Sequence, residues 1–137
     1  MLSSKSKVKN LVYQINGLAI DVHKELGPGL LESVYQKCLI FELKQANIKF
    51  ETELKVPVFF KGNYLNTDLR CDLLIEDTLV VELKTVDSLI PIHDAQLLTY
   101  LNLLQKPIGL LLNFKCLNLY KEGQKTLVNE LFRNLKD

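Results

Sequence analysis

Three charged side chains between residues 70 and 84 could do chemistry together: Asp72, Glu82 and Lys84. Glu82 and Lys84 end an apolar run typical of a buried strand, and alternation along a strand places them on one face. If the preceding strand pairs with this one across a turn at residues 76–77, Asp72 lies near the level of Glu82. Two carboxylates offer hard oxygen ligands to Mg²⁺ or Mn²⁺, and an ammonium group beside them can orient a water and balance charge on a phosphate.

The same spacing has a plainer explanation. Glu82 and Lys84 could be a solvated pair at a sheet edge, with Asp72 in a turn, because an aspartate followed at a distance by Glu-x-Lys is common by chance. Against this, charges at the end of a buried strand are costly unless they are paired or bound to a metal. The spacing alone leaves both interpretations open.

Asp72, followed by Glu82, Leu83 and Lys84 on an apolar strand, resembles the signature of the PD-(D/E)XK nuclease superfamily. The position before the aspartate is Cys71, where the signature has a proline that varies widely among its members. Within this resemblance, Asp72, Glu82 and the Leu83 backbone carbonyl are the metal ligands, and Lys84 positions the attacking water.

Two further motifs extend the resemblance over most of the chain. Gln96 and Tyr100, four residues apart on a predicted helix, are similar to the Q-x-x-x-Y motif of the RecB-like and phage-exonuclease-like branches. Gly29, Glu32 and Tyr35 match the pattern that names the GxxExxY protein family, which is grouped with these nucleases. The resemblance implies that Glu32 lies in or near the metal site, and that Gln96 and Tyr100 face it. From the residues alone, the favoured interpretation is that Glu32 only caps its helix and Tyr35 packs on the hairpin of residues 50–75.

The function that follows from the resemblance is a Mg²⁺- or Mn²⁺-dependent nuclease that hydrolyses phosphodiester bonds in DNA, with RNA less favoured. A net charge of +1 provides little basic excess for duplex binding, because Lys and Arg contacts to phosphates supply most of that affinity. The alternative is a catalytically inactive module of the nuclease fold that binds nucleic acid or protein. A homodimer or larger complex could also supply the substrate surface, with Leu127, Leu131 and Phe132 as a contact.

The 137 residues are expected to form a single domain, 1–137, because the length and a hydrophobic fraction of 47% are ordinary for one globular unit. The cysteines at positions 38, 71 and 116 are odd in number and widely spaced, which favours free thiols in a reducing compartment. No segment has signal-peptide character or the length of a membrane span. We therefore expect a cytoplasmic protein with no membrane contact.

The elements that would position these residues begin with two helices. Apolar residues at helical spacing predict a helix over residues 8–22, and a second helix is expected over 31–45 after the break at residues 27–29. Alternating apolar residues then predict a strand at 50–60, in which Pro57 indicates an edge position or a bulge. After a turn at 61–63, strands at 64–75 and 78–84 complete a meander that carries Asp72, Glu82 and Lys84.

The last third of the chain predicts a helix at 92–105 and an apolar strand at 108–114, which together suggest a parallel crossover from the Glu82 strand. A short strand at 117–120, a turn at 122–123 and an amphipathic helix carrying Leu127, Leu131 and Leu135 are expected to follow. The order α-α-β-β-β-α-β-β predicts an α/β fold with a restriction-endonuclease-like core, in which helices flank a mixed central sheet.

Overall fold

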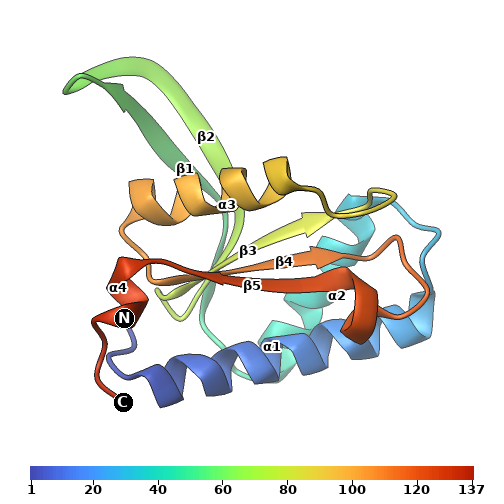
Figure 1. Ribbon diagram of the computed structural model, residues 1–137. Helices are drawn as coiled ribbons and strands as arrows, with labels where there is room; N and C mark the ends of the chain where they lie inside the picture. Colours follow the sequence, from blue (N-terminus) through green and yellow to red (C-terminus); the bar gives the residue numbers. More distant parts are fainter.

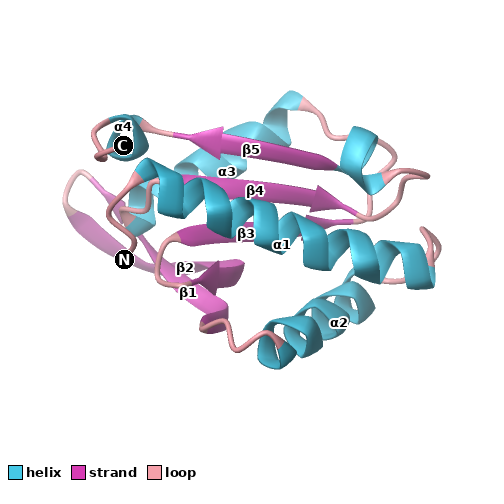
Figure 2. Cartoon of the chain, turned by 90° about the horizontal axis from the view of Figure 1, so that it is seen from below, coloured by secondary structure: helices cyan, strands magenta, loops and turns pink.

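The computed structural model describes residues 1–137 as a mixed sheet with helices on both faces (Figures 1 and 2). The helices are α1 (Lys5–Leu26), α2 (Glu32–Gln45), α3 (Pro91–Leu104) and α4 (Glu130–Arg133), and η1 (Leu119–Gly123) is a turn of π-helix. The strands are β1 (Phe50–Phe60), β2 (Asn63–Ile75), β3 (Leu79–Lys84), β4 (Ile108–Asn113) and β5 (Gln124–Val128). None of the helices combines the length and apolar character needed to span a bilayer.

The sheet has the order β1-β2-β3-β4-β5, with only the β3–β4 pair parallel. The expected parallel crossover through α3 is therefore confirmed, as is the mixed α/β fold consistent with a restriction-endonuclease-like core. β1 is an edge strand whose register with β2 shifts between Pro57 and Phe59, as the proline predicts. Lys61 and Gly62 both have positive φ, which suits a tight two-residue hairpin turn between β1 and β2.

Two apolar layers hold the sheet. α1 and α2 cover one face, shown toward the viewer in Figure 2, and α3 covers the other. The larger layer contains Tyr35, Leu39, Val81 and Leu83, and the smaller one joins Val80 to the buried side of α3. β3 and β4 lie in the middle and are apolar on both faces, which explains their unbroken apolar sequences.

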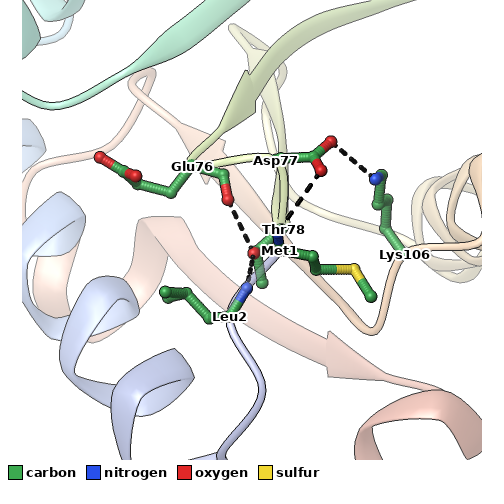
Figure 3. Close-up of polar contacts among 6 residues, drawn as sticks. All are labelled: Met1, Leu2, Glu76, Asp77, Thr78 and Lys106. Carbon is green, nitrogen blue, oxygen red and sulfur yellow. Dashed lines mark hydrogen bonds and ion pairs between the residues drawn. The ribbon is translucent and has the colours of Figure 1, made fainter.

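Polar contacts from two other parts of the chain, the N-terminus and Lys106, hold the β2–β3 turn in place (Figure 3). The Leu2 N–H donates to the Thr78 hydroxyl at 2.8 Å, and the Met1 amino group lies 3.6 Å from Asp77. On the other side, the Lys106 ammonium donates to the Asp77 carboxylate at 2.8 Å, and this bond lowers the pKa of Asp77. These contacts hold the pairing of β2 with β3, on which the position of Asp72 relative to Glu82 depends.

The chain after β4 differs from the prediction. The strand expected at residues 117–120 is wrong, because these residues lead into the π-helical turn η1, which Asn118 caps by accepting from the Lys121 N–H at 3.0 Å. The last strand is β5, which contains Leu127, and only the four-residue α4 replaces the predicted C-terminal helix. β5 forms because its main chain can pair with β4 in antiparallel fashion. If these residues were helical, the main-chain N–H and C=O groups along that edge of β4 would have no partners.

Candidate functional site

Asp72 and Glu82 are joined by two reciprocal hydrogen bonds between neighbouring strands. The main-chain N–H of Asp72 donates to Oε1 of Glu82 at 3.0 Å, and the main-chain N–H of Leu83 donates to Oδ2 of Asp72 at 2.9 Å. The regular ladder between β2 and β3 ends at the Leu73–Val81 pair. Beyond that pair, the two carboxylates accept the hydrogen bonds in place of main-chain carbonyls. The structure thus brings the first two predicted residues into contact.

Burial and neighbouring negative charges raise the pKa of both acids. Glu82 is 7% exposed, and burial, followed by the negative charge of Asp72, raises its pKa to about 8. Burial also raises the pKa of Asp72. The two carboxyl groups are within hydrogen-bonding reach of each other when one is protonated. In the absence of a cation, the pair therefore retains a proton near neutral pH.

Lys84 supplies positive charge to this site without an ion pair. It is half-buried at the end of β3, and it makes no salt bridge or side-chain hydrogen bond. Its charge nevertheless acts to lower the pKa of Glu82, Asp72 and Glu32. The ammonium group is thus close to three carboxylates and free to contact another group.

Glu32 reaches the site from the start of α2. It makes no hydrogen bond, and the helix cap is Leu31, so Glu32 does not act as a capping residue. Its pKa is raised by burial and then by the charge of Asp72, which places the carboxylate on the side of the strand acids. The structure brings Glu32 near the pair but not into hydrogen-bonding contact with it.

Tyr35 has a structural role in the loop before α2. Its ring is fully buried and stacks on Phe114, with centroids 4.4 Å apart, and not on the β1–β2 hairpin. The hydroxyl donates to the Gly27 carbonyl and accepts from the Leu30 N–H at 3.1 Å. Gly29 is exposed, and a Cβ there would meet no atom within 4 Å. In the G-x-x-E-x-x-Y segment, therefore, Tyr35 fixes the loop and Glu32 faces the acids, while Gly29 is not brought to them.

Gln96 and Tyr100 lie one turn apart on α3. The pKa of Tyr100 is raised by burial and then by the charges of Glu82 and Asp72, so its hydroxyl is near enough for both acids to act on it. Gln96 is exposed and makes no hydrogen bond, and both residues border an open pocket of about 230 Å³ that Leu69 of β2 also lines. The structure brings Tyr100 to the site and leaves Gln96 at its rim.

Two residues near the site were missed by the sequence analysis. Glu53 of β1 has a φ of 49°, and its charge raises the pKa of Asp72 and Glu32. Gln36, one turn after Glu32, donates from Nε2 to Oε1 of Glu53 at 3.1 Å and to the Asp72 carbonyl at 3.4 Å. The predicted hairpin could have placed Glu53 beside Asp72, and helical spacing could have placed Gln36 beside Glu32.

A family model described as the PD-(D/E)XK nuclease superfamily matches residues 9–127. The chain belongs to the PD-(D/E)XK nuclease superfamily. No match to it is found among curated proteins or among solved structures. Members of this superfamily are nucleases that generally use divalent metals and act on nucleic acids. The matched range includes all the site residues described in this subsection.

The acids of this PD-(D/E)XK site suit a hard divalent cation. Burial and like charge raise the pKa of both Asp72 and Glu82, and a cation between them would replace the proton that they otherwise retain. No group of three or more His, Cys, Asp or Glu side chains is arranged to hold a metal, and Asp72 and Glu82 are the two acids joined by hydrogen bonds. Two carboxylates with several waters is the coordination that Mg²⁺ tolerates in proteins.

Proposed function

We propose that the protein is a Mg²⁺- or Mn²⁺-dependent nuclease that hydrolyses phosphodiester bonds in DNA, with RNA as the less favoured substrate. The observation that carries this proposal is the pair of reciprocal hydrogen bonds that sets the half-buried carboxylate of Asp72 beside the buried carboxylate of Glu82, with the unpaired ammonium of Lys84 nearby. Membership of the PD-(D/E)XK superfamily supports it.

In this proposal, Asp72, Glu82 and the Leu83 carbonyl hold the cation. The cation would lower the pKa of a bound water and polarise the phosphate. Lys84 aligns the attacking water and stabilises the negative charge that develops on the phosphate. A fixed ammonium group stabilises such charge most strongly where bulk water is excluded. No proton needs to leave Lys84 for either role.

The remaining residues act through these four. Gln96, at the pocket rim, orients Lys84 or a phosphate oxygen, and Tyr100, which borders the same pocket, supports it. Glu32 and Glu53 add negative charge around the site, which favours a divalent cation. Gln36 holds Glu53 in place.

The decisive experiment is cleavage of single-stranded, duplex and branched DNA and of RNA with Mg²⁺ or Mn²⁺, comparing wild type with Lys84→Ala. We expect a rate loss of at least about 100-fold, as is typical when one charge-stabilising donor is removed, with Mn²⁺ binding unchanged. Lys37→Ala, at an exposed position on α2, is the matched control and should cleave normally. Wild-type cleavage by Lys84→Ala would show that this role is wrong.

A second candidate is an inactive nuclease-fold module that binds nucleic acid or protein. The observation that favours it is the lack of a third ligating side chain beside Asp72 and Glu82. The two candidates differ in metal binding, because an inactive module has no need of a cation. A wild-type protein that binds no Mn²⁺ and cleaves no substrate would favour the second.

Three finer assignments belong to the proposal. Membership of the GxxExxY family rests on Gly29, Glu32 and Tyr35, and a cytoplasmic location is compatible with three free cysteines. A homodimer is the third assignment, and its expected contact residues, Leu127, Leu131 and Phe132, are half-buried. Leu127 and Phe132 pack against the protein's own core layers, which leaves little of their surface for a partner.

A further inference from the structure

The β1–β2 hairpin extends well beyond the body of the molecule (Figure 1). We call residues 55–70 the arm. Most of its side chains are exposed, although Val56 near its base is buried. Four large apolar side chains are at or near its tip: Phe59, Phe60, Tyr64 and Leu65, which are 46–59% exposed. None of these four belongs to either core layer. Stability of the fold therefore does not explain why the arm carries them.

The arm is also basic. It carries Lys55, Lys61 and Arg70 against one acid, Asp68, for a net charge of +2, whereas the rest of the chain sums to −1. Lys55 and Arg70 are direct cross-strand partners, and neither forms an ion pair. Like charges opposite one another destabilise a hairpin, so this pairing has a cost that an anionic ligand would offset.

The aromatic side chains at the tip are arranged beside a cation. The Phe59 and Tyr64 rings lie 5.6 Å apart and tilted, and the Lys61 ammonium is 5.4 Å from the centre of the Phe60 ring. Exposed aromatic rings interleaved with basic residues are what single-stranded nucleic acid requires, because unpaired bases stack on the rings while phosphates contact the cations.

The arm leads directly into the candidate site. Arg70 precedes Asp72 by two residues on the same strand, and Leu69 borders the pocket that Gln96 and Tyr100 also line. From its tip to Asp72, β2 can reach about 30 Å at the usual rise per residue. A strand of nucleic acid lying along the arm would thus end at the two carboxylates.

We infer that the arm binds single-stranded nucleic acid and directs it to Asp72 and Glu82, with bases stacked on the tip aromatics and phosphates held by Lys55, Lys61 and Arg70. This inference rests on the proposed function for the reaction itself, but binding along the arm is independent of catalysis. A second copy of the chain is a poorer occupant, because Pro57 and the register shift interrupt the outer edge of β1, where another strand would pair.

The test is fluorescence anisotropy of a labelled oligo(dT) and of a duplex of equal length, in EDTA and low salt, so that no cleavage occurs. Wild type should bind the single strand more tightly than the duplex. Phe60→Ala should weaken binding about 5- to 100-fold, the usual range for loss of one base-stacking ring. Lys61→Ala should weaken binding and make the salt dependence shallower by about 0.7 in logarithmic slope.

Phe41→Ala is the matched control, since Phe41 on α2 is 60% exposed and Phe60 is 59% exposed. It should bind like wild type. Equal affinity of Phe60→Ala and Phe41→Ala, or no binding of oligo(dT) by a folded wild type, would overturn the inference. So would dissociation of a dimer by Phe60→Ala, because the arm would then contact a second copy. Binding that survives in a variant unable to cleave, such as Lys84→Ala, supports the arm whether or not the proposed reaction is correct.

Discussion

The carboxylate of Glu82 accepts a hydrogen bond from the main chain of Asp72, while the carboxylate of Asp72 accepts one from the residue after Glu82. Each carboxylate thus accepts a main-chain hydrogen bond from the neighbouring strand, just beyond the last regular pair between β2 and β3. Because these bonds occupy one oxygen of each carboxylate, the side chains cannot turn away from one another to reduce their repulsion. The site consequently stores unfavourable electrostatic energy that a proton or a cation relieves.

The first prediction concerns pH and stability without metal. The pKa of Glu82 is about 8 in the folded protein against an ordinary 4.5. The folded state therefore binds this proton more tightly than the unfolded state, and the resulting stability is complete below about pH 4.5 and lost as pH rises towards 8. In Glu82→Gln this loss should disappear, which at about 1.4 kcal/mol per pKa unit amounts to a few kcal/mol by pH 8.

The measurement is urea unfolding in EDTA at a series of pH values for wild type and Glu82→Gln. Glu51→Gln, at an exposed position on β1, is the control and should follow the wild-type curve. If wild type and Glu82→Gln show the same pH dependence, Glu82 does not retain a proton in the folded state.

The second prediction concerns the metal. Mn²⁺ titrated into the protein at pH 7 should displace the proton held by Glu82 and Asp72, so that about one proton is released per cation. Calorimetry in two buffers of different ionisation enthalpy measures this number directly. Asp72→Asn and Glu82→Gln should each lose binding, whereas Glu53→Gln should retain it within a few-fold, because Glu53 is nearby but is not one of the two proposed ligands. Retained binding in both of the first two variants would place the metal elsewhere.

The third prediction concerns Tyr35. Tyr35→Phe keeps the ring stacked on Phe114 but leaves the Gly27 carbonyl and the Leu30 N–H without their side-chain partner. Loss of a partner by part-buried polar groups costs about 1–3 kcal/mol, so the urea midpoint should fall accordingly. Since the same loop leads to Glu32, nuclease activity should fall as well. Tyr13→Phe, at a tyrosine 84% exposed on α1, should change neither quantity.

The fourth prediction compares two glycines. A Cβ at Gly123 would lie 2.4 Å from the main-chain oxygen of Asn113, which cannot move without disturbing the end of β4, so Gly123→Ala should destabilise the protein by about 1–3 kcal/mol. Gly17→Ala is the matched change, because a Cβ there meets nothing within 4 Å and the position is inside α1. It should stabilise the protein by about 0.5–1 kcal/mol. Thermal unfolding of both variants checks the opposite signs.

Much of the site could be predicted because its residues are carried by strongly patterned elements. The unbroken apolar sequence of β3 and the turn before it predicted the approach of Asp72 to Glu82, which the structure bears out geometrically. The helical spacing of Gln96 and Tyr100 predicted that they share one face of α3, and both line the same pocket. Only Tyr100 is near enough to Asp72 and Glu82 for their charges to raise its pKa. Their catalytic roles remain predictions.

The errors lie where tertiary contacts override local pattern. Leu127, Leu131 and Leu135 have helical spacing, but the edge of β4 pairs with residues 124–128 and makes them a strand. The π-helical turn before them depends on the close approach of Gly123 to Asn113, which has no sequence signature. Glu53 was overlooked because its strand was interpreted as an ordinary alternating edge, without the positive φ that it adopts.

β2 runs from the exposed arm into the buried sheet, with solvent-exposed residues before Leu69 and buried ones from Cys71 onward. The main-chain amides of the outer half are sheltered only by the facing strand β1, so they can exchange their hydrogens with water through local opening. Those of the inner half are sheltered by both core layers and exchange only when the domain unfolds. We therefore expect amide hydrogens to exchange faster in the outer half of β2 than in the inner half, which carries Asp72.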